Sequence, residues 1–271
     1  MQAIAAPPAL EFAGVSCAFA ARGGTGRYTA VGETTLAIAP GEFVSLVGPT
    51  GCGKTTLLNV AAGLLAPSSG TVRVHGEPIM GINAKAGYMF QADALMPWRN
   101  ALGNVRAGLE FRGVPRDEAN ARAMDWLARV GLAGFEDRYP HQLSGGMRKR
   151  VALAQMLILD PELLLMDEPF SALDIQTRHL MENELLELWS ANRKSVLFIT
   201  HDLEEAIALS DRVVVLSAGP ATRPLGEFAI TLPRPRDVAD IRMSPQFVAL
   251  HEAIWQVLKS EVLRGYAQAR R

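Results

Sequence analysis

The sequence has few cysteines, little net charge and no long apolar run, and each shortage excludes a class of protein. Only two cysteines, Cys17 and Cys52, occur among the 271 residues. They exclude a disulfide framework and favour a reducing compartment. A formal net charge of -1 provides no general attraction to nucleic acid or anionic lipid, so no nucleic-acid partner is expected. No apolar run approaches the roughly 18 residues that cross a bilayer.

The amino-terminal stretch MQAIAAPPALEF has no basic region and is interrupted by Pro7 and Pro8. It does not predict a secretory signal, and we expect the chain to stay in the cytosol. An apolar content of 49% predicts a folded chain with a full core rather than a disordered one.

Short β-like segments and one Gly-rich insert occupy about residues 10–47. The segments are LEFAGVSCAF, ETTLAIA and EFVSLVG, and the insert is ARGGTGR. They predict an antiparallel edge that leads into the first strand of the core. Farther along, TTLLNVAAGLLAP has helical apolar spacing and SSGTVRVHGEPI predicts a hairpin.

Helical spacing dominates from about residue 100 to 139, most clearly in RDEANARAMDWLARVGL, and predicts a helical insert. Helices and strands then alternate. GGMRKRVALAQMLIL and TRHLMENELLELWSAN are helical, whereas ELLLMDE, SVLFIT and RVVVLS are apolar strands. This alternation predicts a mostly parallel, buried sheet.

The stretch GPTGCGKTT, residues 48–56, lies between an apolar strand and a helical pattern. It satisfies the phosphate-loop pattern G-x-x-x-x-G-K-[ST] in the context that this pattern requires. Its N–H groups and the helix dipole would bind phosphate, Lys54 would contact the β and γ oxygens, and Thr55 would bind Mg²⁺. We expect Cys52 to be a small packing residue, with redox sensing as the alternative. The candidate ATP-binding residues of the loop are Gly48, Pro49, Thr50, Gly51, Cys52, Gly53, Lys54, Thr55 and Thr56.

A second polar signal is the run ELLLMDEP, in which an apolar strand ends in Asp167 and Glu168. Carboxyl ends of parallel strands are where doubly wound folds bind ligands. Asp167 would therefore hold Mg²⁺, and Glu168 would polarise the attacking water as general base.

A third signal is QLSGGMRKRVALAQ, where Ser144, Gly145 and Gly146 open a helix and create another anion-binding terminus. With this stretch the sequence resembles the ATP-binding cassette family. LSGG is similar to the signature motif, GPTGCGKTT to the Walker A loop, LLLMDEP to the Walker B strand, SALD to the D-loop and ITHD to the switch-histidine segment. The motifs occur in the family's order between about residues 10 and 220.

The resemblance implies an α/β P-loop NTPase with a mostly parallel sheet, an antiparallel β edge and an inserted α-helical subdomain. The ATPase domain would cover residues 10–225, with the helical subdomain at about 92–142. A short helical tail, residues 226–271, would follow.

The resemblance also implies a dimer in which two cassettes pair head to tail. Ser144, Gly145 and Gly146 of one copy would face the γ-phosphate held by Lys54 of the other. Gln91 would contact Mg²⁺ and the attacking water, and His201 would contact the γ-phosphate. The catalytic residues would then be Glu168, His201 and Gln91, and the Mg²⁺ ligands Thr55, Gln91 and Asp167.

An aromatic side chain that stacks on adenine is expected shortly before the strand that leads into the phosphate loop. The Gly-rich insert leaves both Phe19 and Tyr28 eligible. Phe19 is the preferred candidate, and either ring could instead belong to the sheet core.

The chain has one cassette, no long heptads and no zinc-binding cysteines, unlike soluble cassettes of DNA repair or translation. It resembles a stand-alone transport ATPase, and FQADALMPWRNALGNVRAGLEFRGV is similar to the nitrate, sulfonate and taurine branch of bacterial importers. The resemblance implies a homodimer on the cytoplasmic face of a bacterial inner membrane, with two permease subunits and a periplasmic solute-binding protein. An importer for another solute, such as a pyrimidine vitamin precursor, and an exporter ATPase stay as alternatives.

The helical insert and the segment around Gln91 would form the groove that receives a permease coupling helix. Its expected apolar contacts are Leu95, Met96, Trp98 and Leu102. Met147 and Lys149 stand where related signature helices often carry glutamine, a departure expected to leave the phosphate contacts intact.

Overall fold

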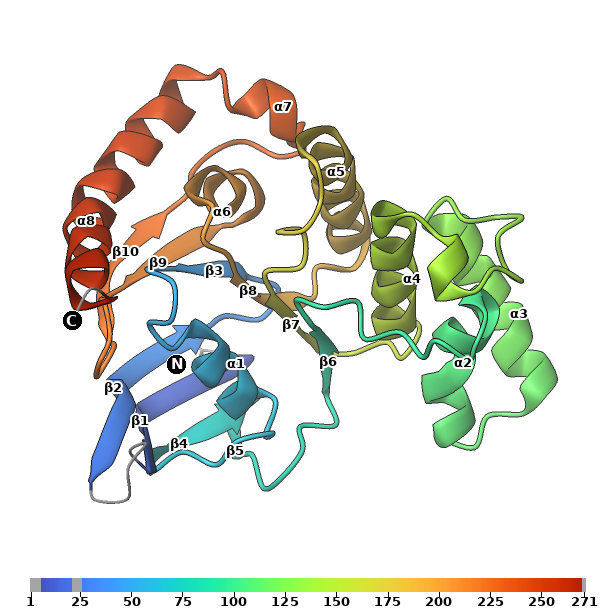
Figure 1. Ribbon diagram of the computed structural model, residues 1–271, viewed down its shortest axis with the longest axis horizontal. Helices are drawn as coiled ribbons and strands as arrows, with labels where there is room; N and C mark the ends of the chain where they lie inside the picture. Colours follow the sequence, from blue (N-terminus) through green and yellow to red (C-terminus); the bar gives the residue numbers. More distant parts are fainter. Residues whose placement is uncertain (1–5, 21–25, 270–271) are drawn as a thin grey trace, which may run out of the picture.

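The computed structural model describes residues 6–20 and 26–269. The first five residues of the amino-terminal stretch and residues 21–25 of the Gly-rich insert lie outside the described ranges. Within those ranges the strands form two sheets, and helices cover both faces of the larger one (Figure 1).

The larger sheet has six strands in the order β10-β9-β3-β8-β7-β6. All neighbours are parallel except β10, which pairs with β9 in the antiparallel sense. The prediction of a mostly parallel sheet is confirmed. The strands are β3 (Phe43–Val47), β6 (Ala86–Met89), β7 (Leu163–Asp167), β8 (Ser195–Ile199), β9 (Arg212–Leu216) and β10 (Pro224–Ala229).

The predicted antiparallel strands form a sheet of their own, in the order β2-β1-β4-β5. Their apolar faces pack with α1 and with one face of the parallel sheet, because long strands with alternating burial need a covering layer. The predicted hairpin is the antiparallel pair of β4 and β5. The strands are β1 (Leu10–Ala20), β2 (Arg27–Ile38), β4 (Ser69–Val74) and β5 (Glu77–Pro78).

Alternate residues of β3 face two different cores. Val44 and Leu46 pack with α1 and the antiparallel sheet, whereas Phe43 and Val47 pack with the helices on the opposite face. These and the remaining helices are α1 (Lys54–Ala61), α2 (Ala101–Phe111), α3 (Arg116–Arg129), α4 (Gly145–Leu157), α5 (Ile175–Asn192), α6 (Leu203–Leu209), α7 (Val238–Ile241) and α8 (Pro245–Ala269), with a 3-10 turn at Pro140–Gln142.

The helical insert has a core of its own, formed by α2 and α3 against one side of α4. Val105, Ala123 and Leu127 are buried there at helical spacing. Figure 1 shows this unit on the far side of β6 and β7 from α8. The insert is thus joined to the sheet through α4 and through the segment that follows β6.

The carboxyl-terminal helices pack on the cassette instead of forming a separate unit. Val238, Phe247, Ile254 and Leu258 are buried in the same core as Trp189. The helix α8 spans 25 residues within the tail expected at residues 226–271, and it runs along the outside of α6 and β9 (Figure 1). Over the described residues, no helix combines the length and apolarity needed to cross a membrane.

Candidate functional site

The phosphate loop connects β3, which ends at Val47, to α1, which begins at Lys54. Gly53 has a φ of 109°, and a Cβ there would lie 3.1 Å from the Val31 side chain, so glycine is required for both conformation and space. The Lys54 ammonium is buried and donates to the Gly48 and Pro49 carbonyl oxygens at 2.8 and 3.0 Å. A cation is therefore held against the loop that would surround a phosphate.

Thr55 and Asp167 meet across the site. The Thr55 hydroxyl donates to Asp167 Oδ1 over 3.2 Å, and burial raises the pKa of the Asp167 carboxyl above its ordinary value. Two hard oxygen ligands at the edge of a phosphate loop suit Mg²⁺, which uses few protein ligands and keeps bound water and substrate phosphates. The residues present therefore fit a bound Mg²⁺.

Glu168 follows Asp167 at the end of β7 and contacts the switch histidine. His201 Nδ1 and Glu168 Oε2 lie 2.9 Å apart. Glu168 has a φ of 42°, a left-handed conformation that is unfavourable for a residue with a side chain. Its N–H donates to the Ile199 carbonyl and its own carbonyl accepts from the Ser171 hydroxyl. These bonds hold the strained residue so that its carboxylate reaches the end of β8.

The stretch LSGG starts α4 as predicted. Ser144 is the N-cap and its hydroxyl accepts from Met147 N–H at 3.2 Å. A Cβ on Gly146 would lie only 2.7 Å from Thr177 Cγ2, at the start of α5. Among the hydrogen bonds of the described residues, none joins Ser144, Gly145 or Gly146 to the phosphate loop. The site within one chain thus contains Lys54, Thr55, Asp167, Glu168 and His201 without the signature residues.

Gln91 is exposed, and its backbone is tied to the signature helix. The buried ammonium of Lys149 donates to the Gln91 carbonyl at 2.7 Å and pairs with Asp93 at 3.2 Å. Arg148 pairs with the same carboxylate at 2.7 Å. In the sequence Lys149 stood out only as a departure from related helices, and no local pattern indicated its contacts with Gln91 and Asp93.

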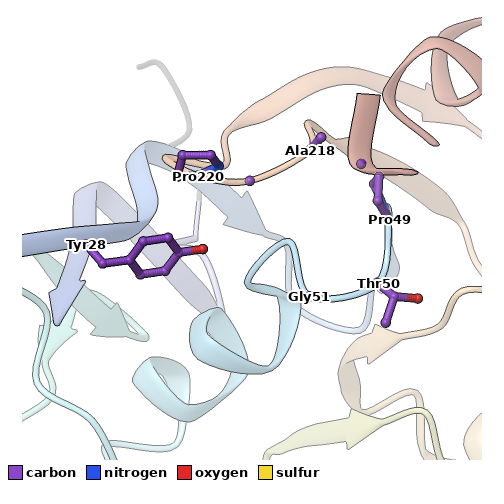
Figure 2. A pocket seen from close by; sticks show the side chains of 8 residues that line it. Tyr28, Pro49, Thr50, Gly51, Ala218 and Pro220 are labelled. Carbon is purple, nitrogen blue, oxygen red and sulfur yellow. The ribbon is translucent and has the colours of Figure 1, made fainter. Parts of the chain in front are cut away.

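A cavity of about 380 Å³ lies beside the phosphate loop (Figure 2). Tyr28 lines it, whereas Phe19, its cross-strand neighbour, does not. The carboxyl-terminal helix also reaches this cavity, which no local sequence signal indicated. The lining residues are Tyr28, Pro49, Thr50, Gly51, Ala218, Gly219, Pro220 and Gly265.

Cys52 is buried within the loop, and burial raises the pKa of its thiol despite the nearby Lys54. A thiol with a raised pKa is a poor nucleophile. The observation agrees with the packing role expected for Cys52.

Comparison with known proteins identifies the class to which this site belongs. A model of the ABC transporter family matches residues 31–171, and the chain belongs to that family. It is an ATP-binding subunit of the ABC type that binds and hydrolyses ATP.

Relatives and solved structures of the same class span most of the chain. An uncharacterised ABC transporter ATP-binding protein of Methanocaldococcus jannaschii is 48% identical over 239 residues, covering 88% of each chain. The taurine import ATP-binding protein TauB of Burkholderia pseudomallei is 44% identical over 250 residues, covering 91% of this chain and 95% of that protein. The ATP-binding cassette MJ0796, solved as a dimer in a post-hydrolysis state with ADP and Pi, superposes with a TM-score of 0.72. It is 29% identical, and the match covers 83% of this chain and 100% of that one.

Proposed function

We propose that this ABC ATPase powers a bacterial importer for a small anion of the sulfonate, taurine or nitrate type. The observation that carries the proposal is the similarity to taurine import ATP-binding proteins along most of the chain, at 44% identity for the Burkholderia pseudomallei protein and 42% for the Yersinia pestis protein. The ATPase would lie at the cytoplasmic face of the inner membrane, beneath two permease subunits supplied by a periplasmic solute-binding protein.

The phosphate loop would bind ATP through its N–H groups and Lys54. The Lys54 ammonium would exchange its bonds to the Gly48 and Pro49 carbonyls for bonds to phosphate oxygens. Thr55 and Asp167 would hold Mg²⁺, with the Gln91 side chain as a further ligand. The bound ion would neutralise charge on the β- and γ-phosphates. Tyr28 or Phe19 would stack on adenine, and the cavity beside the loop favours Tyr28.

Glu168 would accept a proton from the attacking water as general base. Its contact with His201 places a second polar group at the same point, where His201 would orient the γ-phosphate. Gln91 would contact the attacking water from the segment after β6. In this proposal the strained backbone of Glu168 serves to aim its carboxylate.

The signature residues would act on the other copy in a homodimer. Ser144, Gly145 and Gly146 expose the N-terminal end of α4, where N–H groups favour an anion. The absence of bonds from them to the phosphate loop among the described residues supports a role across a dimer interface. The related MJ0796 cassette was solved as a dimer, which supports the same arrangement.

A groove between the sheet and the helical insert would receive the permease. A cavity of about 220 Å³ lies at the junction of β6 and α4. Trp98 follows the lining residue Ala94 by four positions along the chain and is exposed. Leu95 and Leu102 are partly buried against the core of the insert. Trp98 therefore offers more exposed apolar surface to a permease helix than either leucine does. The cavity residues include Tyr88, Phe90, Asp93, Ala94, Gln155 and Leu159.

The assigned base is tested by measuring ATP hydrolysis of the purified Glu168→Gln variant. Loss of a general base should lower kcat at least about 100-fold, while ATP binding persists because the phosphate loop is unchanged. Glu252→Gln, an exposed change on α8, is the matched control and should keep wild-type turnover. Normal multiple turnover by Glu168→Gln would overturn the assignment.

The transported class is tested by growth of a strain that carries only the Glu168→Gln form, with taurine, short alkanesulfonates or sulfate as sole sulfur source. Failure on the sulfonates with normal growth on sulfate is the expected result. Normal growth on all three would remove the sulfonate assignment and leave nitrate, other anions and pyrimidines.

Permease coupling is tested by growth of a strain whose only copy of the ATPase carries Trp98→Ala and keeps Glu168. Trp98 is 72% exposed, and Phe111, also in the insert, is 77% exposed. Trp98→Ala should impair growth on the transported compound, whereas Phe111→Ala, a matched loss of exposed apolar surface, should not. Equal growth of both variants would contradict the assigned groove.

A further inference from the structure

Two buried carboxyl groups meet behind the switch histidine. Glu182 from α5 and Glu205 from α6 are almost fully inaccessible to solvent, and among the described residues one carboxyl oxygen of each, Oε1, is buried without a hydrogen-bond partner. Burial raises the pKa of Glu182 to about 7 and that of Glu205 to about 8. A pair of this kind is costly to ionise unless a cation lies beside it.

That cation is supplied by the carboxyl-terminal segment. Arg242, which ends α7, pairs with Glu182 at 3.4 Å and with Glu204 at 3.7 Å, and it hydrogen-bonds to His179. Within the described residues, Arg242 is the ion-pair partner of Glu182. The other charged or titratable groups facing the pair are Arg178, His179, Asp202 and Glu204.

The pair sits where it can control the start of α6. Asp202, the N-cap of α6, accepts from the Glu204 and Glu205 N–H groups at 2.9 and 3.2 Å. The Arg178 guanidinium pairs with the Asp202 carboxylate at 3.2 Å. It also donates to the carbonyl of Leu173 in the D-loop, so it links the D-loop to the start of α6. His201 immediately precedes the cap, so a shift of α6 would move the histidine that contacts the candidate base.

The same segment also holds the other end of α6. The buried guanidinium of Arg236 donates to the Ala208 and Ser210 carbonyls at 3.0 and 2.8 Å. Backbone carbonyls at a helix C-terminus attract cations. Arg236 and Arg242 thus fix α6 at both ends, and only Arg242 does so through titratable carboxyl groups.

We propose that Arg242 is a positioning residue for ATP hydrolysis: it compensates the buried Glu182–Glu205 pair, and thereby keeps α6 and His201 aligned with Glu168. This inference rests on the proposed roles of Glu168 and His201. Without the cation, the pair either takes up protons or moves toward water, and the second response shifts the start of α6. The side chain of Arg242 is only 17% exposed. Water that enters after its removal would therefore compensate only part of the lost positive charge.

The test is steady-state ATP hydrolysis by Arg242→Met, which keeps most of the aliphatic stem. We expect kcat to fall about tenfold, the scale of a small misplacement in an active site, while KM for ATP changes less than about twofold. Arg242→Lys keeps the charge and should retain most of the activity. Arg106→Met is the matched control, because Arg106 also has 17% exposure and an ion pair, with Glu110, and it should keep wild-type kcat.

The double variant Arg242→Met with Glu182→Gln separates charge compensation from simple packing. A neutral amide needs no counter-charge, so kcat should recover to within about threefold of that of Glu182→Gln alone. The loss in Arg242→Met should also grow as pH rises from 6 to 8.5, because the uncompensated pair then has to ionise, and this trend should vanish in the double variant. A loss that is independent of pH and unrelieved by Glu182→Gln would overturn the proposal, as would wild-type kcat in Arg242→Met.

Parallel assays distinguish this inference from the proposed function. If Glu168→Gln is inactive and Arg242→Met is normal, only the role of Arg242 fails. If Glu168→Gln turns over normally, the assigned catalytic centre fails. Should Arg242→Met not fold, Arg242→Lys carries the test, since wild-type kcat there supports the role of the charge and a tenfold loss refutes it.

Discussion

Gly146→Ala should destabilise the protein, although alanine is the better helix former. The added Cβ would lie 2.7 Å from Thr177 Cγ2, whereas at neighbouring Gly145 the nearest atom to a Cβ is 3.7 Å away. Carbon atoms prefer about 3.5–4.0 Å, so of these two changes only the one at Gly146 forces the Thr177 side chain or the helices α4 and α5 to shift. The two adjacent positions therefore form a matched pair.

The magnitude follows from two opposing terms. Overpacking costs about 1–3 kcal/mol, and Gly→Ala in a helix gains up to about 1 kcal/mol. The helical gain is similar at both positions and cancels when the variants are compared. Gly146→Ala should thus be less stable than Gly145→Ala by about 1–3 kcal/mol.

Urea unfolding at equilibrium measures this difference, provided that the slope m is the same for both variants. Thr177→Ser removes the offending methyl group and keeps the hydroxyl, so adding it to Gly146→Ala should restore most of the lost free energy of unfolding. Thr177→Ser alone completes the cycle. Equal stability of the two alanine variants, or no recovery with Thr177→Ser, would refute the clash.

Three further predictions concern the site and its surroundings. Lys149→Met removes the donor to the Gln91 carbonyl and should lower the free energy of unfolding by about 1.5–3 kcal/mol. An unchanged urea midpoint would contradict this prediction. The raised pKa of Glu205 means that the unfolded carboxyl ionises above its ordinary pKa of 4.5 while the folded one keeps its proton until about pH 8. Stability should therefore fall as pH rises between these values and level off above them, and Glu205→Gln should flatten a curve of unfolding free energy against pH. Tyr28→Ala should weaken ATP binding about tenfold by titration calorimetry, and a loss confined to Phe19→Ala would assign the adenine contact to Phe19.

Local patterns were sufficient to predict the parallel sheet and the starts of the key helices. The apolar runs before Gly48 and Asp167 are buried strands, and Ser144 caps α4 as its position before two glycines indicated. These features depend on neighbours in sequence. Period, cap chemistry and turn residues therefore identify them without knowledge of the fold.

Features that depend on distant partners were not predictable. The edge strand β10 has alternating partial exposure and lies among prolines, so its sequence resembles a loop. The contacts of Arg236 and Arg242 can be recognised only in the folded chain, where α7 packs on α5 and α6. The distance along the chain between Arg242 and Glu182 follows no local pattern that would predict their contact. The packing of α8 on the cassette was not predictable for a similar reason. Its buried residues face a core that only the folded cassette creates.

The end of α8 has a practical consequence, because it lies against the phosphate loop. A Cβ on Gly265 would be 3.3 Å from Pro49, and Glu261 accepts the Ala218 N–H at 2.7 Å. The next residue, Tyr266, is largely exposed, while the native thiols of Cys17 and Cys52 are buried. A single cysteine introduced at Tyr266 would accept a fluorophore selectively and place it within reach of the nucleotide. The chain thereby offers a site for an optical reporter of ATP binding that leaves the loop itself untouched.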